Sequence, residues 1–460
     1  MANLLHQKWF KPALLALLVI LQLALLFTTT FLRPPFTESE DAYLLLAQAP
    51  AAESAADGAQ ETARASSNVA ANCAAWGVAP LYALLLHASC RILPETIAPG
   101  AMNLLFFILT WIVLYAAARR LLPDRWDAAL VPLIYGFTAA AALTVRSCGP
   151  YMLAAFFAAM LLLLLAAIQK KPRGKLQHVV LFFTILGGFL TVYEFLLLVL
   201  ALCAVYGVYC GMRRCWSGLA TTLVSASAAL LSAIVLYPAC IEHFAANTAL
   251  FALNYPARLH VLYDSISDAL FGGMFTPVLV IFTLLLAAAA FFRAAAPKKV
   301  PAAPVSAAVH AGTETEVPHH ASGGDPAEAA YQRRIARRTE EPRKKHRKRM
   351  GDAISLYIML ALVILVYLLL LPLSHSVPIT YSPHTYEQIQ TVPQAELCWM
   401  VAPLLVFFST SLLYRSIPAI GGNHRAAVLI TAGFFLALAI ISFVLCPIFA
   451  QSSAAWLFRA

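Results

Sequence analysis

Long apolar runs constrain this sequence more than any other feature. An α-helix of about 20 apolar residues crosses the hydrocarbon core of a bilayer, and runs close to that length recur from one end of the chain to the other. Because lipid offers no hydrogen-bond partners, each run must satisfy its own backbone polar groups, and a helix does this within one segment. The sequence therefore predicts an all-α polytopic membrane protein.

Composition supports a membrane protein and argues against a nucleic-acid-binding protein. Only 12% of the residues are charged and 61% are hydrophobic, whereas about a quarter of the residues of a soluble domain are charged. The formal net charge of +10 lies mainly in short loops and one long insert. The topology rule and contact with anionic lipid explain such a distribution, so we expect no nucleic-acid partner.

We expect about eleven transmembrane helices, counting one run that is long enough for two. The run 179–212 divides at Thr191-Val192-Tyr193-Glu194 into a hairpin with Glu194 at its outer tip. Arginines close several runs on one side, which places that side and the N-terminus in the cytoplasm. The expected spans are 13–32, 101–118, 128–145, 151–168, the two arms of 179–212, 219–237, 276–292, 353–371, 397–414 and 426–449.

Composition also divides the chain into three parts. The insert is rich in Ala, Pro, Gly and charge and has no apolar period, so we expect it to be disordered. Its basic run at 333–349 would lie against anionic lipid. The parts are a transmembrane core at 1–293 with a first external loop at 33–99, a basic cytoplasmic insert at 294–350, and C-terminal helices at 351–460 with an external loop at 374–396.

The first external loop has three sections. It opens on the acidic stretch that contains Glu40 and Asp41, continues through a loose loop at 50–72, and ends in a helix at 77–93 that is broken by polar residues and expected to lie along the membrane surface. Cys73 and Cys90 both fall in this loop and could pair, although two cysteines alone are a weak signal.

Glu40 and Asp41 are the first candidates for chemistry. Carboxylates at the mouth of a membrane span are costly to bring near lipid, so they require a reason. One reading is structural, since acids in the first turn of a helix favour its dipole and Thr37 or Ser39 could cap that helix. The other reading is a general base that activates a hydroxyl.

Other residues expected on the outer side would complete such a site. Arginine suits a phosphate because its planar fork binds two oxygens, and aromatic rings suit a sugar. Each residue also has a plain reading: a snorkelling arginine, an interface aromatic or a solvated turn. The outer residues are Glu40, Asp41, Tyr82, His87, Arg146, Tyr151, Glu194, Glu242, His243, Arg258 and His260.

These motifs resemble the bacterial GT-C glycosyltransferases related to protein mannosyltransferases and the lipid A aminoarabinose transferase. The family's Asp-Glu pair with Ala-Tyr is similar to Glu40-Asp41-Ala42-Tyr43, where the acids are swapped. Its His-Pro-Pro-Leu-Tyr segment is similar to Val78-Ala79-Pro80-Leu81-Tyr82, which lacks the histidine and the first proline. Its Arg-Glu-Ala-Arg-Pro-Tyr stretch is similar to residues 146–151, which keep Arg146, Pro150 and Tyr151 and lack the acid and the second arginine. The resemblance covers roughly residues 1–240.

The resemblance implies a fold, a reaction and a location. The donor would be a polyprenyl-phosphate sugar, the acceptor a lipid, glycan or protein, and the transfer would invert the anomeric carbon. Asp41, with Glu40 beside it, would be the base, and Arg146 the main phosphate ligand. The active site would face outward from a bacterial plasma membrane. Some GT-C members use a divalent metal, and two adjacent carboxylates could bind one. The other substrate-binding candidates are Tyr82, Tyr151, Glu194, Arg258 and His260.

Two other functions remain open at this point. A transporter or flippase for a lipid-linked solute would show internal repeats, broken spans or charges at mid-membrane. The two halves show no repeat, and the charges gather at the ends of spans. A non-catalytic envelope protein with a GT-C fold would keep its cellular role after replacement of both Glu40 and Asp41, whereas a transferase would not.

Overall fold

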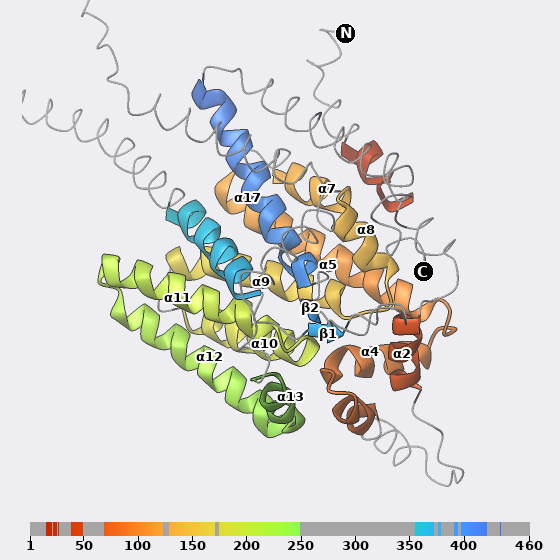
Figure 1. The fold of residues 1–460 in the computed structure, drawn as a ribbon. Helices are drawn as coiled ribbons and strands as arrows, with labels where there is room; N and C mark the ends of the chain where they lie inside the picture. The colour runs from red at the N-terminus through yellow and green to blue at the C-terminus, as the bar shows by residue number, and fades with distance from the viewer. Residues whose placement is uncertain are drawn as a thin grey trace, which may run out of the picture.

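The fold is known from a computed structural model that describes most of the N-terminal half of the chain and part of the C-terminal half (Figure 1). Predicted features that fall elsewhere lie outside the described residues, among them the insert 294–350, the spans 276–292 and 426–449, Arg258 and His260. The described residues are 15–20, 22–24, 26, 38–48, 69–122, 128–170, 174–248, 355–371, 376–378, 391–393, 397–420 and 433.

The described part is a helical bundle, and it includes four helices that are long and apolar enough to cross a membrane. This agrees with a polytopic helical membrane protein, while the total of about eleven spans stays a prediction. Shorter apolar helices accompany them, namely α10 (Lys175–Thr191), Ser355–Leu370 and part of α17 (Leu397–Ile420). The four long helices are α5 (Ala98–Leu121), α9 (Tyr151–Lys170), α11 (Phe195–Arg213) and α12 (Trp216–Leu236).

The predicted hairpin is confirmed at its turn. Helix α10 ends at Thr191, α11 begins at Phe195, and Glu194 lies in the turn between them. Two adjacent glycines let α10 approach its neighbours closely, because a Cβ at Gly187 would lie 2.5 Å from the Phe157 ring and one at Gly188 would lie 2.4 Å from the Phe195 ring. Close approach at small residues is a common basis of helix packing in membranes.

The transmembrane helix predicted at 128–145 is interrupted. The chain forms two short helices, α7 (Leu130–Gly136) and α8 (Ala139–Arg146), and Thr138 caps the second by accepting a hydrogen bond from the Ala141 N–H at 3.2 Å. The break frees carbonyl groups of the preceding turn. One of them, at Leu133, accepts a hydrogen bond of 3.3 Å from the Gln22 side chain amide in the first apolar run. The Gln22 amide therefore supplies the Leu133 carbonyl with a hydrogen bond that lipid cannot supply.

The helices alternate in direction, which gives the bundle two distinct ends (Figure 1). At one end the Tyr151 and Trp399 rings meet at 5.6 Å, and the Tyr367 hydroxyl donates to the Leu397 carbonyl at 2.9 Å. At the opposite end Gln169 at the close of α9 donates to Ser355 at the start of the next described helix. The numbering of these pairs fits strictly alternating helices, as the predicted topology requires.

We call these ends the loop end and the basic end. The basic end carries Arg119 and Arg120 in the last turn of α5 and Arg213 and Arg214 at the close of α11. The loop end carries the helical residues 69–75 and the following elements: α2 (Glu38–Ala47), α4 (Pro80–Cys90), the 193–194 turn and α13 (Ala239–Thr248).

The connecting segments hold more regular structure than the sequence suggests. Residues 69–75 are helical, although the predicted loose loop at 50–72 includes their first half. The predicted surface helix at 77–93 is shorter and begins at Pro80, a residue that favours the first helical turn. In the predicted loop 374–396, β1 (Ser376–Pro378) pairs antiparallel with β2 (Thr391–Pro393), with Val377 opposite Val392. This ribbon is a small exception to an all-α fold.

Candidate functional site

Helices α2 and α4 lie side by side and parallel at the loop end. The Tyr43 and Tyr82 rings meet edge to face, with centroids 5.6 Å apart and an interplanar angle of 88°. Four residues further along α2, the Ala47 carbonyl lies 2.6 Å from Nδ1 of His87. His87 thereby satisfies one of the carbonyl groups that the end of a helix leaves without an intrahelical partner.

This register locates the predicted acids. Residue 43 lies beside residue 82 and residue 47 beside residue 87, so the numbering rises together in the two helices. Glu40 and Asp41 are in the first turn of α2, and the same offset places their backbone next to the start of α4, near Pro80. Their side chains lie outside the described residues. A first-turn position suits acids through the helix dipole, as the structural reading expects.

Tyr82 connects α4 to the segment that follows α8. Its side chain is fully buried, and its hydroxyl lies 4.0 Å from Sγ of Cys148, to which it donates a weak hydrogen bond. Asn103, also fully buried, donates from Nδ2 to the Ser147 carbonyl at 2.6 Å. Arg146 is the last residue of α8 and directly precedes these anchored residues. The burial of Tyr82 favours a role in packing over direct contact with a substrate.

Two tyrosines clasp the chain that leads into α4. The Tyr193 hydroxyl donates to the Val78 carbonyl at 3.1 Å, and the Tyr237 hydroxyl lies 3.2 Å from the Ala70 carbonyl and 3.4 Å from that of Val78. Burial raises the pKa of both tyrosines, so both hydroxyls stay protonated and able to donate. We call this arrangement the tyrosine clasp. It fixes the start of α4 to the α10–α11 turn and the end of α12.

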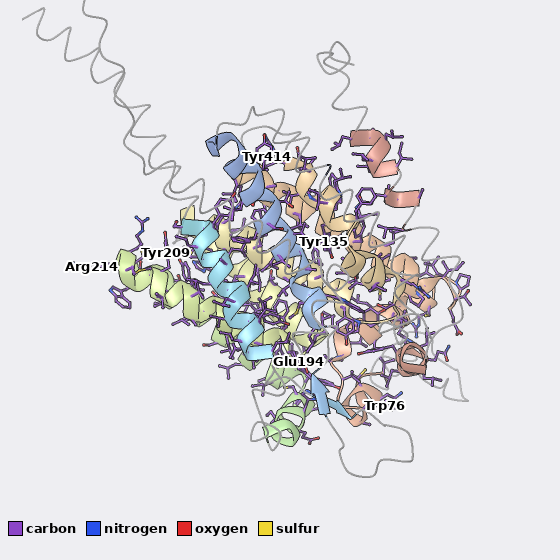
Figure 2. All side chains as sticks on the ribbon, turned by 45° about the horizontal axis from the view of Figure 1, so that its top comes forward. Trp76, Tyr135, Glu194, Tyr209, Arg214 and Tyr414 are labelled. Carbon is purple, nitrogen blue, oxygen red and sulfur yellow. The ribbon has the colours of Figure 1, made fainter. Side chains whose placement is uncertain are left out.

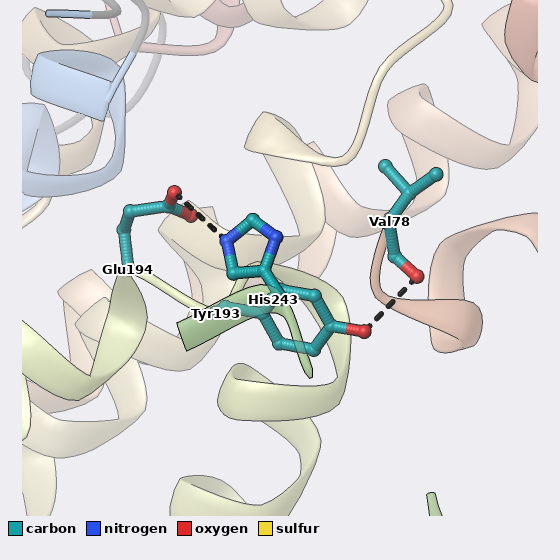
Figure 3. A network of polar contacts seen from close by, with 4 residues as sticks. All are labelled: Val78, Tyr193, Glu194 and His243. Carbon is teal, nitrogen blue, oxygen red and sulfur yellow. Dashed lines mark hydrogen bonds and ion pairs between the residues drawn. The ribbon is translucent and has the colours of Figure 1, made fainter. Parts of the chain in front are cut away.

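A carboxylate and an imidazole meet beside the clasp (Figure 3). Oε1 of Glu194 lies 3.9 Å from Nε2 of His243 in α13, and the two side chains are 13% and 12% exposed. The imidazole also packs on the Tyr193 ring, with centroids 4.6 Å apart. On its other side the chain turns at Gly77, where φ is +65° and an added Cβ would lie 3.6 Å from Nδ1 of His243.

The predicted site residues therefore fall into two groups. Six of them belong to the loop end: Glu40, Asp41, Tyr82, Arg146, Tyr151 and Glu194. Tyr151 begins α9, and its half-buried ring meets Trp399 edge to face. Arg258 and His260 lie outside the described residues. The start of α4 links the acids of α2 to Glu194, because α2 lies beside it and the clasp joins it to the turn that holds Glu194.

Sequence reasoning missed several residues that organise this end. His87 and His243 appeared only as outer-side residues, and their partners, Ala47 and Glu194, are 40 and 49 positions away in the chain, so no local pattern pairs them. Asn103 and Tyr237 were not singled out at all. A buried amide at the start of a membrane span was the one signal that could have identified Asn103, because an apolar residue would have been the default there.

The proposed pairing of Cys73 with Cys90 is wrong for this fold, in which both are free. Cys73 lies beside Val78, whose N–H donates to its carbonyl at 2.9 Å, before α4 begins. Cys90 is the last residue of α4. A helix of that length separates its ends by about 15 Å, whereas a disulfide needs Cα atoms within about 7 Å. Burial also raises the pKa of the Cys73 thiol to about 11.

The arrangement brings acid–base groups to one end of an otherwise apolar bundle. Among the side chains that the structure describes, no group of three or more His, Cys, Asp or Glu residues forms a metal-ligand set. Glu40 and Asp41 are not among those side chains. No family model, no characterised protein and no solved structure matches the chain in the three comparisons.

Proposed function

We propose that this chain is a glycosyltransferase of the bacterial plasma membrane that moves a sugar from a polyprenyl-phosphate donor to an acceptor on the outer side. The observation that carries the proposal is the convergence at the loop end. The acidic first turn of α2, the Arg146 segment and Glu194 all lie around the start of α4, while arginines occupy the opposite end.

The chemistry needs a base and a cation in one place. The acceptor hydroxyl or amine attacks the anomeric carbon from the face opposite the phosphate, so a new bond forms as the carbon–oxygen bond to phosphate breaks. Asp41, or Glu40 beside it, takes the acceptor proton. Arg146 stabilises the charge that gathers on the departing phosphate oxygens. Polyprenyl phosphate leaves, and the anomeric configuration inverts. A divalent metal held by the two adjacent acids is compatible with this proposal.

The partners follow from the same proposal. The donor is a lipid-linked sugar, the acceptor a lipid, glycan or protein, and anionic lipid contacts the basic run 333–349 on the cytoplasmic side. Arg258 and His260 remain candidates for the donor phosphate. Tyr82, Tyr151 and Glu194 remain candidates for contacts with the substrates, and the burial of Tyr82 favours a role in packing.

A direct test measures release of polyprenyl phosphate by the purified full chain in lipid nanodiscs, with a panel of polyprenyl-phosphate sugars and water or a simple alcohol as acceptor. Loss of the base should lower the rate about 100-fold or more in Asp41→Asn or Glu40→Gln. Arg146→Ala should also lower the rate. The matched control is Glu95→Gln, because Glu95 is an exposed acid of the same external region. Equal rates in all four variants would contradict the proposal.

A second candidate function has one observation in its favour. The third predicted span is broken between α7 and α8, and transporters use discontinuous helices to build sites at mid-membrane. In that case the chain would move a lipid-linked solute without cleaving it. Movement of a fluorescent polyprenyl-phosphate sugar across vesicles, with no release of polyprenyl phosphate, would favour transport over transfer.

A further inference from the structure

Two tryptophans stand out of the surface at opposite ends of the bundle. Trp76 is 65% exposed at the loop end, and Trp216 is 63% exposed at the basic end. Figure 2 labels Trp76 and Glu194 at one end and Arg214, near Trp216 in the chain, at the other. Tryptophan is enriched at both membrane–water interfaces, so the plain reading makes both side chains interfacial anchors.

Their surroundings differ in chemistry. Trp216 follows Arg213, Arg214 and Cys215 and begins α12, so its neighbours in the chain suit an anionic lipid surface. Trp76 is followed by Gly77, whose φ of +65° turns the chain against the imidazole of His243. A positive φ is readily adopted only by glycine, so the glycine at position 77 permits this close approach of the backbone to His243.

The Glu194–His243 pair, which Gly77 approaches, is able to bind hydroxyls. The Glu194 carboxylate accepts hydrogen bonds, and the His243 imidazole can donate or accept according to its tautomer. Both side chains keep 12–13% of their surface exposed, which leaves edges within reach of a ligand. The tyrosine clasp holds the 69–78 segment, so Trp76 is carried on a backbone that is fixed at Ala70 and Val78.

Trp76 directly precedes Gly77, so its backbone lies close to the Glu194–His243 pair, and an indole near paired polar groups would match the two faces of a sugar. The C–H groups on one face of a pyranose pack against an indole, and the hydroxyls at its edge need donors and acceptors. A lipid phosphate does not fit as well, because His243 lies beside the Glu194 carboxylate, which repels an anion.

We propose that Trp76, together with Glu194 and His243, forms a carbohydrate-binding subsite at the loop end. Its role as the place where a glycan acceptor is held rests on the proposed transferase function, but sugar binding itself does not. The subsite lies next to the start of α4, and so next to the backbone of Glu40 and Asp41 by the register described above. The acceptor is then a glycan rather than a bare lipid or a protein side chain.

Binding of soluble oligosaccharides to the full chain in nanodiscs tests this subsite without any donor. The probes are chitotetraose, maltotetraose and mannotriose, followed by ligand-observed saturation-transfer NMR. Trp76→Ala should weaken binding of the preferred probe about tenfold or more, the loss expected for one aromatic stacking contact. Glu194→Gln should weaken it as well, and Trp76→Phe should restore part of the affinity.

The matched control is Trp216→Ala, which removes an equally exposed tryptophan from the basic end. It should leave oligosaccharide binding unchanged. No binding of any probe by the parent chain would overturn the proposal, as would equal loss in the two alanine variants, the result expected of two interfacial anchors. The protein could bind sugar through Trp76 and yet release no polyprenyl phosphate. That result would support the subsite and contradict the transferase function.

Discussion

The loop end and the basic end of this bundle are held together in different ways. At the loop end, side chains reach backbone carbonyls far away in the chain: the buried Tyr193 donates to the Val78 carbonyl, and the half-buried His87 lies 2.6 Å from the Ala47 carbonyl. At the basic end the Thr221–His178 pair and the Arg120 bond to the Leu163 carbonyl are exposed, whereas the Gln169–Ser355 bond is part-buried. The difference indicates that particular side-chain contacts determine the geometry of the loop end, whereas the basic end depends mainly on its positive charges.

The glycines of the α10–α11 hairpin offer the strongest way to break this contrast. A Cβ at Gly188 would lie 2.4 Å from the buried ring of Phe195 near the loop end, whereas a Cβ at Gly207, further along α11, would meet Leu219 at 3.8 Å. Gly188→Ala should therefore cost about 2 kcal/mol of unfolding free energy through overpacking. Gly207→Ala should change it by less than about 0.5 kcal/mol.

Thermal unfolding of both glycine variants in the same detergent provides the measurement. A lower midpoint for Gly188→Ala with an unchanged midpoint for Gly207→Ala supports a tightly packed loop end. Equal midpoints for the two variants would mean that the packing around the 193–194 turn is no tighter than elsewhere in the hairpin.

The tyrosine clasp is expected to give a smaller effect and to sharpen the comparison. Tyr193→Phe and Tyr237→Phe should each cost about 1 kcal/mol, because each removes one hydroxyl donor. The double variant should cost more than the sum, since it removes both tyrosine donors from the Val78 carbonyl. Thermal unfolding and limited proteolysis between residues 69 and 78 would both report the loss.

A matched control for the clasp lies at the basic end. Thr221→Val removes the 3.2 Å contact with His178, which is exposed, so its cost should stay within about 0.5 kcal/mol. Strictly additive tyrosine effects, or a Thr221 effect as large as theirs, would remove this distinction between the loop end and the basic end.

The sequence predicts much of the helical frame because its signals are local. Continuous apolar runs with basic residues at one end locate α5, α9 and α12, and the residues at 191–194 divide the hairpin at the observed turn. The break between α7 and α8 was not predicted, because the residues around it are as apolar as those of a continuous transmembrane helix. Thr138 and the preceding Gly136 were the only local signs of a new helix start.

The site is harder to predict because its contacts join distant segments. Topology alone assigns Glu194 and His243 to the same side, but their pairing depends on α13 folding back over the turn. The clasp joins tyrosines to carbonyl groups more than 100 positions away, at Ala70 and Val78. Backbone carbonyls carry no mark in a sequence, so no motif could reveal these bonds.

An external transferase requires the loop end to face outward, and labelling at the two tryptophan positions tests this orientation most directly. Trp76 and Trp216 have nearly equal exposure, 65% and 63%, so Trp76→Cys and Trp216→Cys are matched in accessibility. Intact bacteria expressing each variant are treated with a membrane-impermeant maleimide, and labelling of the parent chain is subtracted. We predict labelling of Trp76→Cys in intact cells and of Trp216→Cys only after permeabilisation. The reverse pattern would place the acids in the cytoplasm and contradict an external transferase.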